Sequence, residues 1–452
     1  MRELLRDDRR YLFHGFVSPA RARREGSVVL VRGKGPYVWD ARGRRYLDGV
    51  SSLWNVAIGH GNARIARAVA RQIRKLSYAT TLLGFSSEPA VELARELVRL
   101  APRGLSRVVF TSGGSEANET AVRLVRMHWR LRGRNSKTGI VTLERAYHGS
   151  TTGAATLTGL RDFHRGFGPM LPGVFRIPNA YCYRCPLGKT YPRCGVACAD
   201  ELDRAVRRMG ADRVGAFFAE PVQGVGGVIV PPPEYFPKIR EICDRHELLF
   251  VADEVITAFG RLGYPFGIQR WGVTPDLLVF AKGVTSGYLP LGGVLLHERV
   301  ARVFEEAGPD FTLHHGFTYS GHPVVCAGAL ANLEVLRRKR LFRKARSTEK
   351  TLRALLRPLG ELPLVGDIRV VGAMAAIELV RDRSRKTPFP EETRVAWRVR
   401  ERALAHGVIV RGSRDNVILC PPLDLSARLL RTLVSAVDRS IREVGREFGY
   451  RL

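Results

Sequence analysis

Short apolar runs recur along the middle of the chain, and segments with helical periodicity fill the intervals between them. β-Branched and aromatic residues dominate the runs, whereas the intervals space their apolar residues three or four positions apart, as at Ile65, Val69 and Ile73. Apolar strands that alternate with helices are typical of a mostly parallel sheet covered by helices on both faces. The sequence therefore predicts an α/β fold with strands at residues 107–110, 139–143, 214–219, 248–252, 277–281 and 293–296.

The pattern is different toward both ends of the chain. Residues 28–48 form three short apolar stretches separated by turn residues, which is typical of a small antiparallel layer. Beyond residue 323, helical segments (323–337, 346–359, 391–406 and 427–446) are mixed with short strands (368–371, 374–379, 408–410 and 417–419). We expect a large domain at 61–322 and a smaller α+β domain formed by residues 1–60 and 323–452.

The bulk composition is that of a globular protein. Of the 452 residues, 45% are hydrophobic and 26% are charged. No apolar run approaches the ~18 residues that a membrane helix needs. The segment Met1–Arg10 is densely charged and lacks the apolar core of a secretory signal. These features predict a cytoplasmic protein without a membrane partner.

The net charge of +30 is large, and it comes from 63 arginines beside only ten lysines. A charge of this size is compatible with binding to nucleic acid or to an acidic surface. The arginines are spread along the chain rather than gathered in one stripe, and no nucleic-acid-binding motif of the usual kinds is present. We interpret the charge as an arginine-biased surface and keep a basic nucleic-acid-binding protein as the non-enzymatic alternative.

Four of the seven cysteines lie close together in the sequence, at Cys182, Cys185, Cys194 and Cys198. Four such thiols can close a structural zinc site, form disulfides or stay free in a packed loop. Their spacing is shorter than in the usual pair-of-pairs zinc ribbon, so they are a possible structural site and not an assigned metal centre. We interpret residues 179–199 as an insertion in the large domain, away from the active site.

Two strand ends carry residues with clear chemistry. Lys282 follows the apolar run that ends at Ala281, and Gly283 comes directly after it. A desolvated lysine can form an imine, and it can lose its proton near neutral pH, which arginine cannot do. Asp253 comes at the end of another apolar strand, at residues 248–252. An acid and a lysine at the ends of neighbouring strands can reach the two ends of one pyridoxal ring. The alternative is a solvated lysine at a strand end.

Two further segments have the composition of an anion site. The segment Phe110–Asn118 joins a strand to a helix and contains two adjacent glycines. Free N–H groups at the helix start, near Gly114 and Ser115, can bind a phosphate. Thr318, in a loop that precedes another helix, can add a hydroxyl donor. The alternative is an ordinary turn with a helix cap.

Other strand ends carry side chains that can contact a planar ring. Tyr147 and His148 follow the strand at 139–143, where an aromatic side chain can stack on a heterocycle. Glu220 ends the strand at 214–219, and Val255, two residues after Asp253, can press on the opposite face of the ring. Each of these side chains could equally be part of the packed core.

Taken together, these motifs resemble the class III (subgroup II) pyridoxal-phosphate-dependent aminotransferases of fold type I. The resemblance runs from Gly35 to Leu423. It implies that Lys282 forms an imine with pyridoxal 5′-phosphate, that Asp253 pairs with the pyridine nitrogen, and that Tyr147 stacks on the ring. It also implies that Gly114 and Ser115 bind the phosphate. The family further implies a homodimer, or a dimer of dimers, in which Thr318 reaches the phosphate site of the other copy.

The segment Asp48–Gly61 is similar to the stretch that lines the substrate pocket in ω-amine:pyruvate and taurine:pyruvate members of the family. By this resemblance Leu53 and Trp54, together with Phe16 and Phe85, would form apolar walls. Such walls suit amines whose body is uncharged or carries a distal acid. The alternative for each of these side chains is burial in the core.

Arg411 matches the arginine that binds the substrate carboxylate in this family. A guanidinium holds a carboxylate by two parallel hydrogen bonds, which suits a 2-oxoacid. The family usually has proline after this arginine and glycine before the following aspartate, whereas this chain has Gly412 and Arg414. The geometry of this loop is therefore open, and Arg414 can compete for the acid.

The expected function is the transfer of an amino group from an ω-amino acid or amine to a 2-oxoacid such as pyruvate, in two half-reactions. Ser51–Trp54 also resembles the diaminopelargonate-forming members, which use adenosylmethionine as the donor. An aminomutase or racemase of the same fold would keep Lys282 without net exchange with pyruvate. The sequence does not choose among these donors.

Overall fold

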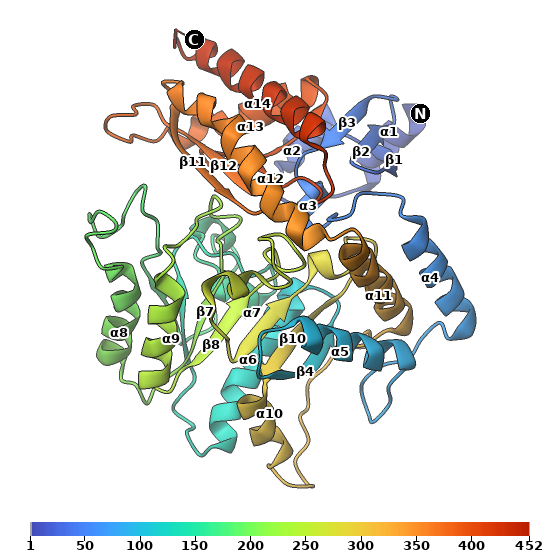
Figure 1. Cartoon of the computed structure of the whole chain (residues 1–452), viewed down its shortest axis with the longest axis vertical. Helices are drawn as coiled ribbons and strands as arrows, with labels where there is room; N and C mark the ends of the chain where they lie inside the picture. The colour runs from blue at the N-terminus through green and yellow to red at the C-terminus, as the bar shows by residue number, and fades with distance from the viewer. Residues whose placement is uncertain (1, 452) are drawn as a thin grey trace.

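The computed structural model describes residues 2–451 and is built around one large sheet (Figure 1). Its strand order is β4-β10-β9-β8-β7-β5-β6, and β10 alone is antiparallel to its neighbours among the described strands of this sheet. The predicted mostly parallel sheet is thereby confirmed. The strands are β4 (Leu105–Thr111), β5 (Gly139–Leu143), β6 (Val174–Ile177), β7 (Val214–Ala219), β8 (Leu249–Asp253), β9 (Leu277–Phe280) and β10 (Gly292–His297).

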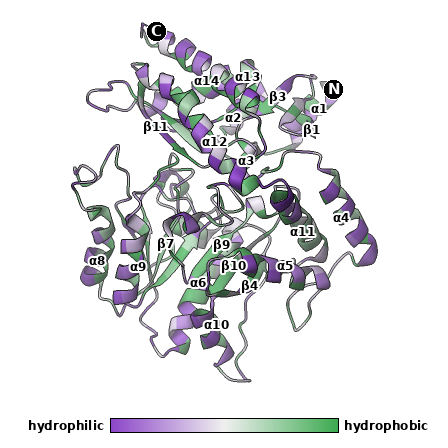
Figure 2. Ribbon diagram, viewed as in Figure 1, coloured by the Kyte–Doolittle hydropathy of each residue, from purple (hydrophilic) through white to green (hydrophobic). Residues whose placement is uncertain are grey.

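The central strands are apolar on both faces because helices cover both faces. Every residue of β5, β7, β8 and β9 is buried. Neighbouring residues of one strand belong to different cores: Phe217 packs in one and Phe218 in the other. Figure 2 shows the hydrophobic strands enclosed by helices with hydrophilic outer faces. Continuous apolar runs of this kind specify a sheet buried on both sides.

Helices surround this sheet and continue toward both chain ends. Helix α11 packs against α4 and α5, which lie before the large sheet in the sequence. Because α11 begins at residue 323 and packs against helices that precede the large sheet, the domain boundary proposed between residues 322 and 323 stays a prediction. The helices are α1 (Arg2–Tyr11), α2 (Pro19–Glu25), α3 (Ser51–Trp54), α4 (Ala63–Lys75), α5 (Glu88–Leu100), α6 (Gly114–Leu131), α7 (Thr152–Leu157), α8 (Ala197–Met209), α9 (Tyr235–Arg245), α10 (Glu298–Glu305), α11 (Pro323–Arg338), α12 (Leu341–Leu356), α13 (Val395–Ala405) and α14 (Ala427–Glu447).

Two smaller sheets stand above the large one in Figure 1. One has the order β1-β2-β3-β13 and the other β11-β12-β15-β14. Strand β13 pairs in parallel with β3, so segments from both ends of the chain share a sheet, as predicted. The strands are β1 (Leu30–Lys34), β2 (Tyr37–Asp40), β3 (Arg45–Asp48), β11 (Val365–Val371), β12 (Met374–Leu379), β13 (Val408–Ile409), β14 (Arg411–Ser413) and β15 (Asn416–Leu419).

The structure differs from the sequence prediction at a few elements. Strand β6 was not expected, because Phe175 and Arg176 are exposed on this edge strand and its apolar signal is weak. Helix α12 ends at Leu356, before the predicted end at 359, since Pro358 comes two residues later and a short 3₁₀ turn, Arg357–Glu361, replaces the α-helix. Strand β14 contains Arg411, where a loop was expected. Within residues 2–451, no helix combines the length and the apolar character needed to cross a membrane.

Candidate active site

A cavity of about 380 Å³ opens at the carboxyl ends of β4, β5, β7, β8 and β9. In open parallel sheets, ligands bind at this edge. The structure brings eight of the predicted site residues together in the lining of this cavity. They are Gly114, Ser115, Tyr147, His148, Glu220, Asp253, Val255 and Lys282.

Lys282 follows the end of β9 and is half-buried in the cavity wall. Its backbone is left-handed, with φ 46°, which is uncommon for a residue other than glycine. Burial lowers the pKa of Lys282 to about 8, and Asp253 and Glu220 oppose this shift. Among the residues that the structure describes, no hydrogen bond or ion pair engages its amine, which lines the cavity. The amine is therefore available to a ligand and titrates near neutral pH.

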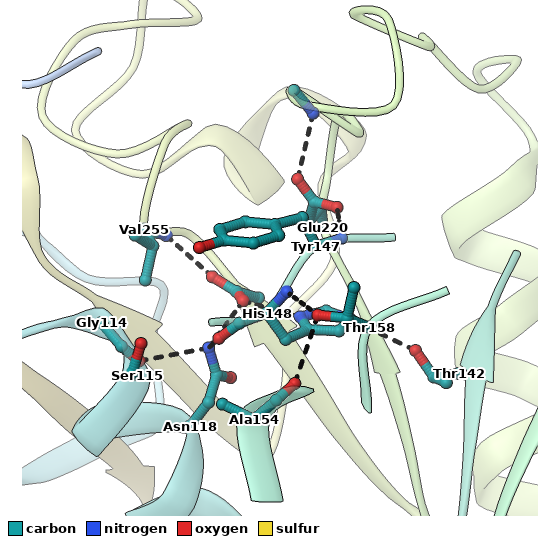
Figure 3. Close-up of polar contacts among 12 residues, drawn as sticks. Gly114, Ser115, Asn118, Thr142, Tyr147, His148, Ala154, Thr158, Glu220 and Val255 are labelled. Carbon is teal, nitrogen blue, oxygen red and sulfur yellow. Dashed lines mark hydrogen bonds and ion pairs between the residues drawn. The ribbon is translucent and has the colours of Figure 1, made fainter. Parts of the chain in front are cut away.

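The Asp253 side chain is held by three neighbours, Asn118, His148 and Val255, which are labelled in Figure 3. Its Oδ2 accepts a hydrogen bond from Asn118 Nδ2 at 2.8 Å and lies 2.7 Å from His148 Nδ1. Its Oδ1 accepts from the backbone N–H of Val255 at 3.0 Å. His148 is itself fixed, since its Nε2 lies 3.2 Å from Thr142 Oγ1. The carboxylate thus has one defined orientation at the floor of the cavity.

The side chain of Glu220 lines the same cavity and is 4% exposed. Burial raises the pKa of Glu220 to about 7, and the neighbouring Asp253 adds to the rise. The backbone N–H groups of Tyr147 (2.9 Å) and Gly224 (3.0 Å) donate to its two oxygens and lower the pKa. Glu220 thereby fixes the loop that carries Tyr147, and it can hold or release a proton near neutral pH.

Helix α6 points its first turn at the cavity. Gly113 is its N-cap, and Gly114 and Ser115 begin the helix. A Cβ on Gly114 would lie 2.9 Å from Val255 Cγ1, so glycine is required here by the close approach of Val255. Ser115 Oγ accepts from the Ser150 N–H at 3.1 Å. The helix start, with its N–H groups and positive dipole end, is a suitable anion site.

A row of aromatic side chains extends from Tyr147 away from the cavity lining. The ring of Phe163 packs on Tyr147, with centroids 5.1 Å apart, and Phe16 packs on Phe163 at 5.7 Å. Phe16 is 77% exposed, so it lies at the outer end of this row. In Figure 3 the ring of Tyr147 lies between Glu220 and His148. The predicted Phe16 is thus linked to the site through Phe163, a residue that the sequence analysis did not select.

The other predicted wall residues take different positions. Trp54 is 2% exposed and belongs to the main hydrophobic core, whereas Leu53 is 56% exposed. Neither lines the cavity of the described chain, but the next residue, Asn55, does. Ser51, Ser52 and Trp54 all have positive φ angles, and Asp48 accepts hydrogen bonds from Val50 N and Ser52 N in this segment. Strained backbone of this kind clusters at functional sites.

Arg411 lies on β14, is half-buried and does not line the cavity, although it is near enough for its charge to act on Lys282. Burial lowers the pKa of Arg411, and the charge of Arg411 in turn lowers the pKa of Lys282. Its Nε has no partner among the described residues. Arg414, the possible competitor, lies 3.6 Å from Asp162 and is 46% exposed. The guanidinium of Arg411 is therefore the one available to an acid beside Lys282.

Thr318 and Phe85 are both exposed and neither lines this cavity. Thr318 is exposed, and its carbonyl accepts a hydrogen bond from the Tyr78 hydroxyl at 2.9 Å. Thr81 N donates to Ser320 O at 2.9 Å, so the segment 78–85 packs along the loop 316–322. Phe85 is 69% exposed. Within one chain, neither residue reaches Lys282.

The four clustered cysteines line one small cavity of about 20 Å³. All four carry free thiols in the structure, and Cys182 is exposed whereas Cys198 is buried. Among residues 2–451, no three histidine, cysteine or acidic side chains are arranged to hold a metal ion. The structure thus gathers the four thiols around one cavity, and the choice among a metal site, disulfides and free thiols stays a prediction.

Asn118 is the main site residue without a role in the sequence analysis. It donates to Asp253, and its Oδ1 is buried with no partner in the described part of the chain. Asn118 is four residues after Gly114 on α6, so helical spacing places it on the same face as the predicted anion site. That spacing could have identified Asn118. Phe163 had no comparable signal, because it lies in a short 3₁₀ turn, Arg161–Phe163, outside the motifs.

Comparison with known proteins identifies the family of the chain. The family model "Aminotransferase class-III" matches residues 19–441. An adenosylmethionine-8-amino-7-oxononanoate aminotransferase of Geobacter sulfurreducens is 40% identical over 98% of both chains. A putrescine–pyruvate aminotransferase of Pseudomonas aeruginosa is 38% identical, over 94% of this chain and 93% of its own. A thermostable (S)-enantioselective ω-transaminase from Thermomicrobium roseum superimposes with a TM-score of 0.95 at 41% identity, over 98% of both chains. The chain therefore belongs to the class-III aminotransferases.

Proposed function

We propose that the protein is a pyridoxal-phosphate-dependent aminotransferase that moves an amino group from an amine or ω-amino acid to a 2-oxoacid such as pyruvate. One observation carries the proposal: Lys282, with a lowered pKa, shares a cavity with the oriented carboxylate of Asp253 at the ends of neighbouring strands. The cofactor, when bound, supplies an electron sink through its protonated pyridine ring.

The residues of the cavity fit this cofactor. Lys282 would take the aldehyde, Asp253 the ring nitrogen, and the start of α6 at Gly114 and Ser115 the phosphate. Tyr147 and Val255 would contact the ring, with Glu220 and His148 behind it. The unpartnered Asn118 Oδ1 and the close approach of Gly114 to Val255 are features of a preformed, narrow site. Thr318 would complete the phosphate site from a second copy of the chain.

The chain's own residues supply the proton transfers. The neutral amine of Lys282 can take a proton from the substrate carbon that bears the amino group, because its pKa is near 8 and no residue that the structure describes binds it. Asp253, fixed by His148 and Asn118, would hold a proton on the ring nitrogen. Arg411 would bind the carboxylate of the acceptor by two hydrogen bonds. Apolar side chains such as Phe163 would exclude water.

The test is direct product detection. The purified protein is mixed with pyruvate and one donor at a time (putrescine, β-alanine, taurine or 1-phenylethylamine), and alanine is measured. We expect alanine with at least one donor, a visible absorption band that bleaches with that donor, and loss of both in Lys282→Ala. A protein that keeps full activity without Lys282 would contradict the proposal.

A second donor class is supported by the comparisons. The G. sulfurreducens relative is an adenosylmethionine-8-amino-7-oxononanoate aminotransferase. Adenosylmethionine is therefore included as a donor, with 8-amino-7-oxononanoate as the acceptor. Amino transfer with this pair, and none to pyruvate, would assign that narrower reaction. Bleaching without net transfer to any acceptor would point to an aminomutase of the same fold.

A further inference from the structure

The two strands that carry Arg411 are bound to a loop of the large sheet by contacts outside the cavity. We name residues 411–419, which comprise β14 and β15, the Arg411 hairpin. Ser413 Oγ donates to the carbonyl of Val225 at 3.0 Å. Arg369 Nε, from β11, donates to the carbonyl of Gly227 at 2.9 Å, and Arg369 also binds Asn416 Oδ1. The hairpin is therefore attached at two points to the loop that begins at Glu220. Ser413 contacts the loop directly, and Asn416 is connected to it through the side chain of Arg369.

Strand β14 is the edge strand of its sheet and pairs only with β15 among the described strands, and the residues that follow Arg411 add little stiffness of their own. Gly412 directly follows Arg411, and a Cβ there would lie 2.6 Å from the carbonyl of Ala396, so helix α13 requires glycine at this point. Arg414, at the turn, has a left-handed backbone with φ 51°. Glycine is conformationally free and a left-handed arginine is strained. The position of Arg411 must consequently come from contacts with the rest of the molecule.

Arg369 is a rigid anchor for such a contact. Its side chain is 10% exposed, and its guanidinium lies 2.7 Å from Glu378 and 2.5 Å from Asp367. The Tyr181 hydroxyl, from the cysteine-rich insertion, accepts a further hydrogen bond at 3.3 Å. A buried guanidinium with this many partners has one geometry. Asn416 is paired with Ser413 across the hairpin, so both attachments act on the same end of it.

We propose that Ser413 and Asn416 are positioning residues that fix Arg411 for the carboxylate of the 2-oxoacid. This inference rests on the proposed function. Arg411 Nε is unpartnered among the described residues, so its direction depends on where β14 lies. A two-point hydrogen bond to a carboxylate loses one contact when the guanidinium shifts by about 1 Å. Loosening the hairpin should therefore weaken acceptor binding and leave the chemistry of an uncharged substrate intact.

The test compares two acceptors in the holoenzyme, pyruvate and the uncharged aldehyde propanal, with one uncharged amine donor. In Ser413→Ala/Asn416→Ala we expect the KM for pyruvate to rise about tenfold, as for the loss of one to two hydrogen bonds. The kcat with pyruvate and the KM for propanal should stay unchanged. Ser413→Ala alone, the milder variant, should raise the pyruvate KM about threefold. The matched control is Ser136→Ala, which removes a similar hydroxyl bond to the carbonyl of Asp212 (2.9 Å) and should change neither KM.

A double-mutant cycle with Arg411→Met identifies the route of the effect. Arg411→Met should raise the pyruvate KM by itself, and adding Ser413→Ala/Asn416→Ala should then change nothing further. Equal increases for propanal and pyruvate, additive effects in the Arg411→Met background, or an unchanged pyruvate KM would each overturn the inference. A complete lack of amino transfer by the unaltered protein would instead overturn the proposed function.

Discussion

The lysine at the centre of the site is held in a conformation that its own chemistry disfavours. Lys282 has a positive φ, a state that costs a non-glycine residue about 1–2 kcal/mol. Asn332 of α11 keeps the following turn in place by donating to the carbonyls of Gly283 (2.9 Å) and Val284 (2.8 Å). Strain held by surrounding contacts is a common way to aim a reactive side chain. Burial of the same residue then brings its pKa into the working range.

The charges around Lys282 predict opposite effects of two substitutions. Glu220 raises the pKa of Lys282 and Arg411 lowers it. Glu220→Gln should therefore lower the pKa of the amine, and Arg411→Met should raise it. Under the proposed function only the neutral amine would capture the cofactor aldehyde, so the rate of capture by cofactor-free protein should rise with pH through the pKa, which is about 8 in the unaltered chain.

The measurement is the rate at which visible absorption develops after pyridoxal phosphate is added, over a range of pH. The midpoint of the profile should move to lower pH in Glu220→Gln and to higher pH in Arg411→Met. Thr432→Ala, on the distant helix α14, serves as the control and should leave the midpoint in place. A midpoint that moves in the same direction in both variants would contradict the charge effects assigned to Glu220 and Arg411.

At the scale of elements, the sequence was most informative where burial was continuous. The central strands and the motifs at their ends follow from unbroken apolar runs, and these predicted Lys282 and Asp253 as neighbours. Strand β14 was missed because Gly412 and Ser413 carry no strand signal; pairing with β15 defines it. The positions of Trp54 and Phe163 depend on tertiary packing, which no local pattern encodes.

The turn that follows Asp253 is organised by a buried acid and predicts a pH-dependent stability. Glu254 accepts hydrogen bonds from the N–H groups of Gly267 (2.8 Å) and Ile268 (2.6 Å), and burial raises its pKa from 4.5 to about 7. Between these two values the folded chain keeps a proton that the unfolded chain releases. Stability should therefore fall as pH rises through this window, by on the order of 3 kcal/mol for a shift of this size.

Denaturant unfolding of the cofactor-free protein at pH 5 and pH 8 measures this loss. Glu254→Gln should reduce the difference in unfolding free energy between the two pH values, because the amide does not titrate. Part of the difference in unfolding free energy should remain in Glu254→Gln, because Glu220, whose pKa is also raised, still titrates. Glu88→Gln alters an exposed acid paired with Lys75 and should leave the pH dependence unchanged. An unaltered pH dependence in Glu254→Gln would refute the assignment.

The cysteine-rich insertion predicts an order of thiol reactivity. Cys182 is exposed, whereas Cys198 is buried and its pKa is raised to about 12 by that burial. A thiol reagent should modify Cys182 first, and Cys182→Ser should remove this fast reaction. The control is Cys243→Ser, which replaces a buried thiol and should leave the fast reaction unchanged. A fast reaction that appears only after a chelator is added would show a metal site, and one that requires a reductant would show a disulfide.

At the scale of the whole molecule, the surface carries features that one chain does not explain. Leu83 is 92% exposed, and Phe85 and Tyr319 are 69% and 59% exposed beside Thr318. Apolar side chains gathered on a rim of this kind mark an interaction surface. The sequence supplies the residues but not their grouping, because the segment 78–85 and the loop 316–322 meet only after folding. The proposed homodimer would cover this surface and bring Thr318 to the second site.

This arrangement predicts that two defective chains can restore one another. Lys282→Ala removes the reactive amine, and Thr318→Glu places a negative charge where the other copy would bind phosphate. Each variant alone should be inactive, or nearly so. In a mixed dimer, the site of the Thr318→Glu chain keeps its own Lys282 and receives Thr318 from the Lys282→Ala chain. Random reassembly of an equal mixture should therefore restore about a quarter of the sites, as expected for a symmetric dimer.

The matched control pairs two lesions that belong to the same chain's site. A mixture of Lys282→Ala and Asp253→Asn can form no intact site, since each chain supplies both residues to its own cavity. Activity should then stay at the level of the separate variants. If the Lys282→Ala and Thr318→Glu mixture also stayed inactive while light scattering showed mixed dimers, the phosphate site would be complete within one chain. Thr318, exposed in the single chain, would then have no part in catalysis, and the apolar rim beside it would need another explanation.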